Sequence, residues 1–336
     1  MWHYCSDILF IHMSNNTIVG VLRGGPSSEY DVSLKTGATV LKNLPEPYAP
    51  ADIFISKEGD WHVAGIARAP ERALKGIDVV FNALHGEYGE DGKVQQILEE
   101  FAMPYNGSRV LPSALAMNKI LAKKVFVNNG IKTPHHVTVK KEQMNPALAR
   151  EIFMSFPQPS VIKPATGGSS IGITVAYTLE DIAEALNNAF LYADSVLIEE
   201  YIKGREAACG VIDRFRGEKV YSLMPTEILD KTNADIWGYD SKYSNDLHEI
   251  ITPGNFSNEE KRQMQDLAKM VHDTLDLSHY SRTDFIVHPK RGVYVLEVNT
   301  LPGLTETSLF PHALVSTGSS LSEFFNHTIQ LALNGK

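Results

Sequence analysis

The chain has 336 residues, of which 43% are hydrophobic and 21% charged, with a formal net charge of -9 at pH 7. This length exceeds that of a usual single domain, so we expect two or three domains. The net negative charge argues against a nucleic acid or an anionic membrane as the main partner. The two cysteines, Cys5 and Cys209, are too few for a disulfide scaffold or a thiolate metal site, which suits a reducing cytoplasm. No apolar run approaches the length that crosses a bilayer.

Residues 1–16 contain a short apolar patch but neither a basic leader nor a small-residue cleavage site. We therefore expect a dispensable N-terminal extension, with Met13 as the functional start, and not a signal peptide. The first predicted domain begins at Thr17.

Predicted strands and helices alternate in the first third of the chain. Buried strands are predicted at 17–22 and 78–84, and helices with apolar spacing at 31–44 and 92–101. This alternation is typical of a small parallel sheet, so the sequence predicts an α/β domain.

Two turns of this domain are candidate binding elements. Gly24 and Gly25 follow the first strand, but the turn lacks the glycine spacing of a dinucleotide site and the Lys-Ser/Thr of a P-loop. We therefore favour an ordinary strand-to-helix turn. His85 follows the second strand, at the edge where open α/β sheets usually bind ligands. A single histidine is more often structural, so His85 does not define a site by itself.

The next segment contains a helix and a glycine-rich loop. Ser113 can cap a helix that runs to the stop at 128–130. Residues 160–176 are predicted to form a strand, a loop and a second strand, with Lys163 just before the small residues 166–170. Backbone N–H groups of such a loop can approach an anion closely, and the lysine can reach the same phosphates. A flexible hairpin tip is the alternative.

Three acidic residues, Glu199, Glu200 and Glu206, stand near a linker between two apolar strands. Main-chain groups of such a linker can contact the edge of a base, while a carboxylate binds ribose hydroxyls. Solvated acidic side chains are the alternative.

Residues 228–254 show no sustained hydrophobic period and include Lys242 and Tyr243. Structureless loops of this length are uncommon unless they are functional. The segment therefore suits a lid that closes over a substrate and excludes water. An amphipathic helix is predicted to follow it, with a capping box formed by Ser257 and Glu260.

Residues 281–303 are predicted to form a hairpin that turns at 289–292. If the turn is centred between positions 290 and 291, Asp284 faces Glu297 and Arg282 faces Asn299. All four side chains then project from one side of the sheet. Facing carboxylates repel unless a cation lies between them. Oxygen ligands suit Mg2+ or Mn2+, whereas a solvated face neutralised by Arg282 is an equally open alternative.

The chain resembles the D-alanine:D-alanine ligases of the ATP-grasp superfamily from about Thr17 to the C-terminus. The stretches that carry the resemblance are GGPSSEYDVS, HGEYGEDG, MNKILAKK, VIKPATGGSSIG, LIEEYIKGRE, DSKY, RTDF and LEVNTLPGLTETS. It implies a three-domain ATP-grasp fold of the α/β (α+β) class. A parallel α/β domain is expected at 17–110, with central and C-terminal domains at 111–200 and 201–336 that grip ATP between them. The last domain carries the metal site and the lid.

The resemblance also implies the activity. ATP drives ligation of two D-alanine molecules to D-alanyl-D-alanine through a D-alanyl phosphate, for peptidoglycan synthesis in the cytoplasm. A homodimer is expected, although the residues alone do not give an oligomeric state. Three alternatives remain: a ligase that takes D-lactate or D-serine second, a phosphotransferase, and a non-catalytic nucleotide-binding module. The intact set of metal ligands argues against the last.

By resemblance, residues fall into three groups. The ligands of two Mg2+ or Mn2+ ions are Asp284, Glu297, which bridges them, and Asn299. The residues expected to contact ATP are Lys119 and Lys163 at the phosphates, Glu199 at adenine, Glu206 at ribose and Lys242 near the γ-phosphate. The residues expected at the two D-alanines are His85, Ser169, Tyr243, Arg282, Gly303 and Ser308.

The sequence departs from the family at one position. Members commonly carry a glutamate that holds the ammonium of the first D-alanine, and Asp31 stands in the matching place here, two positions after Glu29. Aspartate is one methylene shorter, which lengthens a charge-assisted hydrogen bond unless the backbone moves inward. We expect Asp31 to bind the ammonium directly, and Glu29 to contribute little.

Overall fold

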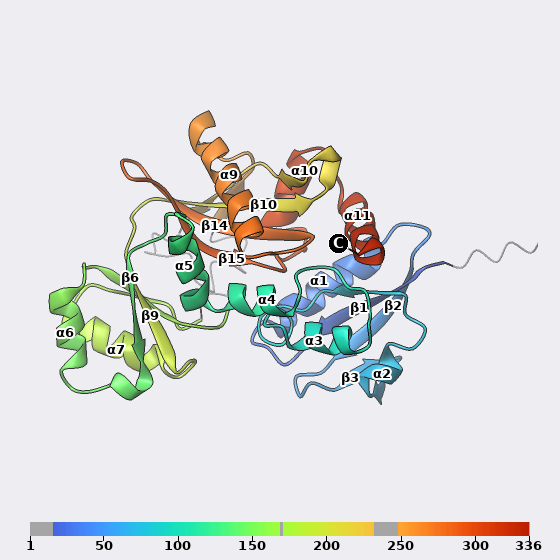
Figure 1. The fold of residues 1–336 in the computed structure, drawn as a ribbon, viewed down its shortest axis with the longest axis horizontal. Coiled ribbons are helices and arrows are strands. Elements are labelled where there is room, and N and C mark those ends of the chain that lie inside the picture. The colour runs from blue at the N-terminus through green and yellow to red at the C-terminus, as the bar shows by residue number, and fades with distance from the viewer. Residues whose placement is uncertain (1–15, 169–170, 232–247, 336) are drawn as a thin grey trace, which may run out of the picture.

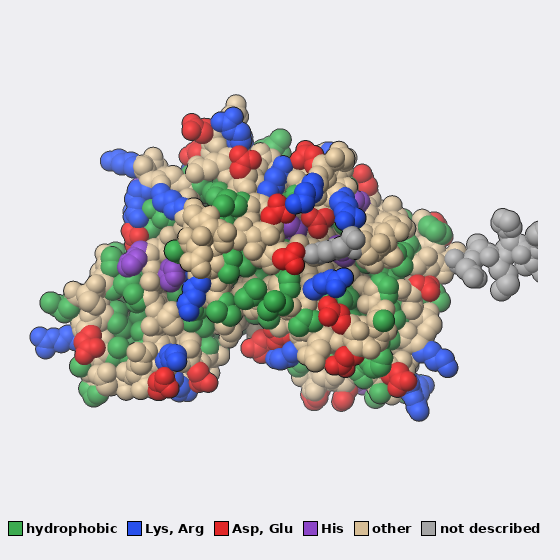
Figure 2. All heavy atoms as spheres, viewed as in Figure 1, with side chains coloured by type: hydrophobic (Ala, Val, Ile, Leu, Met, Phe, Trp, Pro, Cys, Tyr) green, Lys and Arg blue, Asp and Glu red, His purple; other side chains and the backbone are tan. Residues whose placement is uncertain are grey.

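The computed structural model describes residues 16–168, 171–231 and 248–335. They form three lobes, each built around one β-sheet (Figure 1). Acidic and basic side chains are interspersed over the face shown in Figure 2, so the net negative charge is not gathered there. Among the described residues, every helix is too short or too polar to cross a membrane.

The first sheet has the strand order β4-β3-β2-β1-β5. Its strands are β1 Ile18–Gly24, β2 Ala49–Ile55, β3 Trp61–Val63, β4 Ile66–Arg68 and β5 Val79–Asn82. β1 pairs in parallel with both β2 and β5, which confirms the predicted parallel core. β3 and β4 add an antiparallel hairpin at one edge. The sequence analysis missed this hairpin because such short strands carry little periodic pattern.

Helices from both ends of the chain cover this sheet. Those that follow its strands are α1 Tyr30–Asn43, α2 Pro70–Ala73 and α3 Lys93–Glu100. The last two helices of the chain are α10 Leu309–Ser316 and α11 Leu321–Asn334. In Figure 1, α11 lies beside α1. Phe81 of β5 meets Phe325 of α11 with ring centroids 5.3 Å apart, so the C-terminal segment closes the core of the first lobe.

The predicted strand-to-helix turn at Gly24 and Gly25 is confirmed. Both residues have a positive φ, of 93° and 94°. A Cβ at Gly24 would lie 2.2 Å from the carbonyl oxygen of Ile55, which only glycine avoids. Neither glycine lines a described pocket at this end of the sheet.

The helix predicted from Ser113 to residue 128 is two helices. They are α4 Val110–Met117 and α5 Lys119–Asn128, and they run between the lobes (Figure 1). Asn118 breaks the helix with an extended backbone, and its side chain accepts hydrogen bonds from the N–H groups of Ile120 and Leu121. Ser113 lies inside α4, so the prediction that it caps the helix was wrong. The break places Lys119 in the first turn of α5.

The second sheet is antiparallel, with the strand order β6-β9-β7-β8. Its strands are β6 His136–Lys140, β7 Ser160–Pro164, β8 Thr174–Ala176 and β9 Ser195–Glu200. It packs against α6 Leu148–Ser155 and α7 Leu179–Ala189, and a short 3₁₀ helix occupies Lys141–Gln143. The predicted strand, loop and strand at 160–176 are therefore confirmed as β7, its loop and β8.

The third sheet is also antiparallel, with the order β13-β12-β10-β14-β15 and β11 paired with β10. Its strands are β10 Arg205–Asp213, β11 Val220–Ser222, β12 Thr226–Asp230, β13 His248–Ile251, β14 Tyr280–His288 and β15 Gly292–Asn299. A 3₁₀ helix lies at Phe215–Gly217. Helix α9 Asn258–Thr274 covers one face, and its capping box between Ser257 and Glu260 is confirmed.

The ends of the predicted lid are strands. β12 and β13 pair antiparallel, with Ile228 opposite Ile250, so regular structure enters the segment from both sides. The residues between them that were assigned to the lid chemistry, Lys242 and Tyr243, lie outside the described residues.

The β14–β15 hairpin has the predicted pairs but a different turn. Next to the turn, His288 faces Gly292 and Phe285 faces Val295, one residue off the predicted register. A β-bulge between positions 284 and 285 then shifts the pairing. As a result Asp284 does face Glu297, and Arg282 does face Asn299.

Candidate functional site

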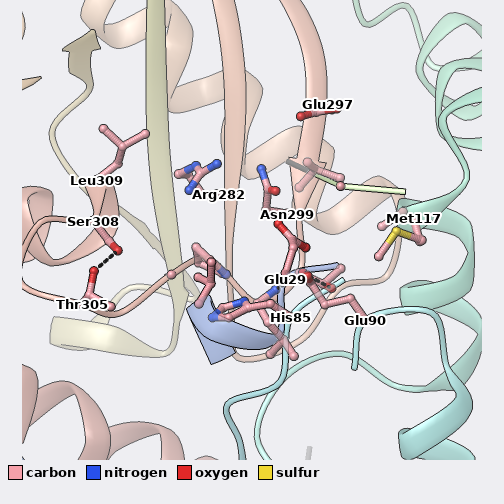
Figure 3. Close-up of a pocket in the computed structure, with 18 of the residues that line it drawn as sticks. Glu29, His85, Glu90, Met117, Arg282, Glu297, Asn299, Thr305, Ser308 and Leu309 are labelled. Carbon is pink, nitrogen blue, oxygen red and sulfur yellow. Dashed lines mark hydrogen bonds between the residues drawn. The ribbon is translucent and has the colours of Figure 1, made fainter. Parts of the chain in front are cut away.

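Two pockets adjoin at the β14–β15 hairpin, and Glu297 lines both of them. The first pocket lies where the carboxyl end of β5 meets the ends of β14 and β15. The residues of the first pocket discussed below are Glu29, His85, Glu90, Arg282, Asn299, Gly303 and Ser308. Figure 3 shows the strand-borne side chains of this pocket facing those that come from the loops. The second pocket lies between the second and third sheets and is lined by Lys163, Glu199 and Glu206 among others.

His85 follows β5 and faces the first pocket, as predicted. Its Nε2 lies 2.8 Å from the hydroxyl of Thr36 on α1, which fixes the orientation of the ring. Burial lowers the pKa of His85 to about 4, and the nearby positive charge of Arg282 acts in the same direction. The imidazole is therefore neutral at physiological pH and serves as a polar, uncharged wall.

Glu90 ties the first lobe to the end of β15. Its carboxylate accepts hydrogen bonds from the N–H of Gly86 at 2.8 Å and from the N–H of Leu301 at 3.0 Å. Burial, and then the charge of Glu29, raise the pKa of Glu90 to about 7. Sequence reasoning gave this residue no role, although it belongs to the HGEYGEDG stretch and directly precedes Asp91.

The predicted place of Asp31 was wrong. Asp31 is exposed in the first turn of α1 and does not line the pocket, whereas Glu29 is buried in it with 8% of its surface exposed. Glu29 immediately precedes the helix, and two positions along a helix amount to a rotation of roughly 200°. The Glu29 carboxylate therefore faces the pocket, and the Asp31 carboxylate faces the solvent. The direction of the side chain, and not its length, decides which of the two can reach a ligand in the pocket.

The Glu29 carboxylate also meets the glycine-rich loop of the second sheet. A Cβ at Gly168 would lie 2.7 Å from Oε2 of Glu29, so a larger residue there would displace this carboxylate. Gly167 and Gly168 both line the first pocket. The loop predicted to bind phosphate thus reaches over the first pocket, and Ser169 in the same loop lies outside the described residues.

Cations accompany the facing carboxylates of the hairpin. Arg282 donates two hydrogen bonds to Asp284, at 2.7 and 2.8 Å. Lys119 Nζ lies 3.3 Å from Oε2 of Glu297 and donates to the carbonyl of Gly167. Arg282 therefore neutralises Asp284, as the alternative to a metal site expected. The metal site at the hairpin stays a prediction.

The hairpin also fits a hard divalent cation. Asp284, Glu297 and Asn299 lie on one face and carry the oxygen ligands that such a cation prefers. In this structure the Nδ2 of Asn299 donates to Asp284 at 3.0 Å, so the amide would have to turn to offer its oxygen beside that carboxylate. Within the described ranges, no group of three or more His, Cys, Asp and Glu side chains could hold a metal ion. A site here therefore requires the amide oxygen of Asn299 or oxygens from a substrate.

The second pocket contains a buried chain of charges. Lys163 Nζ lies 2.7 Å from Oε2 of Glu199, and Lys123 Nζ lies 2.8 Å from Oε1 of the same carboxylate. Burial opposes ionisation of Glu199, but the two lysines outweigh it and lower the pKa of Glu199 to about 2. Burial likewise opposes the charge of Lys163, yet Glu199 and Glu297 raise its pKa overall.

Lys123, which lies behind the wall of this pocket, is a buried charge that sequence reasoning missed. It follows Lys119 by four positions on α5 and is 1% exposed. A lysine on the buried face of an amphipathic helix is the signal that could have found it, because an unpaired buried ammonium is costly. Glu200, one of the three acids singled out in the sequence, instead pairs with Arg291.

The remaining predicted residues lie in the first pocket or beside the second. Ser308 precedes α10, and its hydroxyl lies 2.7 Å from that of Thr305 (Figure 3). Gly303 lies nearby, where a Cβ would come within 2.9 Å of the Ser308 hydroxyl. Glu206 on β10 lines the second pocket opposite apolar residues such as Ile202 and Ile286. The two pockets that these residues line both adjoin the β14–β15 hairpin.

A pocket with apolar walls and buried lysines, joined through an acidic hairpin to a second polar pocket, is the arrangement of an ATP-grasp carboxylate–amine ligase. The comparisons agree with this class. The family model for the D-ala D-ala ligase C-terminus matches residues 125–330, and the model for the D-ala D-ala ligase N-terminus matches residues 63–108. The chain belongs to the D-alanine–D-alanine ligase family.

Relatives support this membership over nearly the whole chain. A D-alanine–D-alanine ligase of Geobacter sulfurreducens is 39% identical over 306 residues, which cover 90% of both chains. One of Pelotomaculum thermopropionicum is 35% identical over 319 residues, covering 94% of this chain and 96% of the relative.

Solved structures give the same result. The D-alanine–D-alanine ligase of Bacillus anthracis has a TM-score of 0.79 and 31% identity, and the match covers 95% of this chain and 98% of that one. A D-Ala:D-Ser ligase of Enterococcus faecalis has a TM-score of 0.82 and 30% identity, with coverage of 94% and 99%.

Proposed function

We propose that this protein joins two D-alanine molecules into D-alanyl-D-alanine, with conversion of ATP to ADP and phosphate, through a D-alanyl phosphate. One observation carries the assignment of the chemistry to this site: Glu297 lies on the wall shared by both pockets. A phosphate chain in the second pocket and a carboxylate in the first pocket therefore meet at the same hairpin.

The second pocket is assigned to ATP. Its apolar side chains pack against the base, while Glu199 accepts from the amino group and Glu206 binds the ribose hydroxyls. Lys119 and Lys163 face the phosphates, since both lie beside Glu297 at the junction of the pockets. Lys242, outside the described residues, is proposed to approach the γ-phosphate from the lid.

The first pocket is assigned to D-alanine. Glu29 takes over the role predicted for Asp31 and binds the ammonium of the first D-alanine, because a buried carboxylate on the pocket wall makes a strong charge-assisted hydrogen bond. Neutral His85 contacts its carboxylate without adding a charge. Ser308, on the wall of the same pocket, binds the carboxylate of the second D-alanine. Ser169 and Tyr243 are proposed to link the glycine-rich loop to the lid.

The reaction then has two steps. A carboxylate oxygen of the first D-alanine attacks the γ-phosphorus, and the bond from that phosphorus to ADP breaks. The second D-alanine, whose ammonium has lost a proton, attacks the carbonyl carbon of the acyl phosphate. Arg282 and the N–H of Gly303 hold the oxygen that becomes negative in this step. The bond to phosphate then breaks, and the peptide bond remains.

Asp284, Glu297 and Asn299 are the residues that would hold two Mg2+ or Mn2+ ions. Such ions, when bound, neutralise charge on the transferring phosphoryl group. Lys119, Lys163 and Arg282 add positive charge of the protein itself next to the transferring phosphoryl group. Exclusion of water matters throughout, because water competes with the amine for the acyl phosphate.

The proposal places the protein in the cytoplasm, as a homodimer that supplies the dipeptide for peptidoglycan. The small number of cysteines, two in the whole chain, supports this location. Light scattering of the purified protein tests the dimer, and a monomer mass at assay concentration would exclude it.

The second substrate needs its own test, because the matched structures include a D-Ala:D-Ser ligase as well as D-alanine–D-alanine ligases. Phosphate release from ATP is measured with D-alanine plus a panel of D-amino and D-hydroxy acids, and the products are identified by mass spectrometry. We expect D-alanyl-D-alanine to dominate. Preferential formation of a D-alanyl-D-serine or D-alanyl-D-lactate product would overturn this choice, and phosphate release without any ligated product would indicate a phosphotransferase.

A further inference from the structure

Lys123 is a buried charge that lines neither of the two pockets. Its side chain is 2% exposed, as is that of its partner Glu199. Removing an ammonium from water costs several kcal/mol even after relaxation, unless partners compensate for the loss of hydration. A charge held at such cost directly behind a pocket wall calls for an explanation beyond packing.

The contacts of Lys123 join three elements. Its Nζ lies 2.8 Å from Oε1 of Glu199 on β9 and donates a hydrogen bond to the hydroxyl of Thr133 at 2.5 Å. That hydroxyl in turn donates to the carbonyl of Val295 on β15, at 2.8 Å. Lys123 therefore sits at the junction of the second and third sheets, the two that form the second pocket.

The charges in this chain do not cancel pairwise. Lys123 and Lys163 share one carboxylate. Burial lowers the pKa of Lys123, and the charge of Glu199 acts against this, so the shared carboxylate favours the charged form of both lysines. Lys163 lines the pocket and Lys123 does not, so a nucleotide can reach only the former. With Lys123 absent, Lys163 and Glu199 would form a neutral pair, and Lys163 would be less disposed to bind an anion.

The two lysines hold both oxygens of the Glu199 carboxylate. Lys123 Nζ lies 2.8 Å from Oε1 and Lys163 Nζ lies 2.7 Å from Oε2. Glu199 lines the second pocket, and a carboxylate that is kept ionised there favours a ligand that donates. The 6-amino group of adenine donates at the position where guanine carries an oxygen, which would face the carboxylate and be repelled.

We propose that Lys123 is a positioning residue of the nucleotide pocket: it orients the Glu199 carboxylate for a base that donates an amino group, and it leaves the charge of Lys163 available to the phosphates. The proposal rests on the assignment of ATP to the second pocket. It adds a residue that acts through Glu199 and Lys163 without touching the nucleotide.

The test compares Lys123→Met with Lys124→Met. Methionine has a similar length and no charge, and Lys124 is the exposed neighbour on the same helix. Affinities for ATP and for GTP are measured by calorimetry in the presence of Mg2+, together with the Michaelis constant for D-alanine. For Lys123→Met we expect ATP binding to weaken about tenfold or more, and the preference for ATP over GTP to fall by a similar factor. The D-alanine constant should stay within about twofold, as should every value for Lys124→Met.

A folded Lys123→Met protein with the ATP affinity and the ATP preference of the parent would overturn the proposal. If that variant does not fold, Thr133→Val decides, because it removes a hydrogen bond to Lys123 and leaves all charges in place. We expect Thr133→Val to lower the preference for ATP over GTP about threefold, and an unchanged preference would overturn the proposal. Failure of the parent itself to bind ATP would instead reject the assignment of the pocket, and the inference with it.

Discussion

Glu90 and Glu199 are both buried glutamates in adjoining pockets, yet their pKa values move in opposite directions. Burial and the charge of Glu29 raise the pKa of Glu90 to about 7. Glu199 is buried as well, but the two lysines that contact its oxygens lower its pKa to about 2. Burial is common to both sites, so the neighbouring charges decide the outcome.

The difference separates the two pockets by chemistry. Acidic side chains outnumber Lys163 in the lining of the second pocket, so a polyanion would bind there through Lys163 together with cations held at Asp284 and Glu297. The first pocket combines the carboxylates of Glu29 and Glu90 with Lys119 and Arg282, which suits both the ammonium and the carboxylate of an amino acid. Glu297 lies on the wall between them, and the proposed reaction carries a phosphoryl group from one side to the other.

The largest effect is expected from Glu297→Gln, because this change acts on both pockets at once. Loss of the charge removes the proposed metal-bridging carboxylate and the partner of Lys119. Ligation should fall about a thousandfold or more, since several kcal/mol of charge stabilisation are removed. Phosphate release and thermal melting are measured on the same samples, with the exposed Glu100→Gln as control. Near-normal turnover in a folded Glu297→Gln protein would remove Glu297 from the site.

The next effect concerns the first pocket alone and compares Glu29→Ala with Asp31→Ala. Glu29→Ala should raise the Michaelis constant for the first D-alanine about tenfold to a hundredfold, because a hydrogen bond to a charged group is lost. Asp31→Ala should change it little, since Asp31 is exposed outside the pocket. Affinity for ATP should be unchanged in both variants. The reverse order of effects would restore the original sequence-based assignment.

A smaller effect is expected from Gly303→Ala, which tests the wall near the second D-alanine. The added Cβ would lie 2.9 Å from the hydroxyl of Ser308, so one of the two must shift by a few tenths of an ångström. Turnover should fall about tenfold while ATP affinity is retained, because only the first pocket is disturbed. Kinetics and calorimetry separate the two quantities. A loss of ATP binding in this variant would contradict the separation of the pockets.

The smallest effect is a change in the pH dependence of stability in Glu90→Gln. The pKa of Glu90 is raised from 4.5 to about 7 in the folded protein. The folded state therefore binds more protons than the unfolded state between these values, and the Glu90 contribution to stability falls as pH rises through them. Two titratable neighbours interact with Glu90. The charge of Glu29 raises the pKa of Glu90, and the charge of Glu90 in turn raises the pKa of Tyr280.

Glu90→Gln removes this slope, whatever its effect at one fixed pH. The unfolding free energy of the variant, relative to the parent, should therefore rise as pH increases from about 5 to about 8. Urea unfolding at several pH values provides the curves, with Glu100→Gln again as control. Parallel curves for Glu90→Gln and the parent would show that the carboxylate is ionised over the whole range.

Residues on strands were predictable from the sequence in a way that residues on loops were not. The pairing of Asp284 with Glu297 followed from the alternation of side chains along β14 and β15. The predicted turn was one residue off, but the β-bulge shifts the pairing by one residue and so restores the predicted pair. Which of Glu29 and Asp31 faces the pocket depended on where α1 starts, a boundary that periodicity defines only to within a few residues.

Long-range packing was the other limit. The partnership of Lys123 with Glu199 joins residues 76 positions apart, counted from their numbers in the sequence, and no local pattern encodes it. The packing of α11 against the first sheet could not be predicted for the same reason, since no local pattern pairs Phe325 with Phe81. Hydrophobic spacing predicted that such helices have a buried face, but not which sheet covers it.

The central claim, that a carboxylate oxygen of D-alanine joins phosphorus at the hairpin shared by the two pockets, can be tested by isotope transfer. D-alanine labelled with oxygen-18 in its carboxylate is incubated with the protein, ATP and Mg2+, and the released phosphate is analysed by mass spectrometry. Attack of that carboxylate on the γ-phosphorus, followed by cleavage of the acyl bond, predicts one labelled oxygen in each phosphate formed with dipeptide. Phosphate that carries no label while labelled dipeptide accumulates would contradict the account.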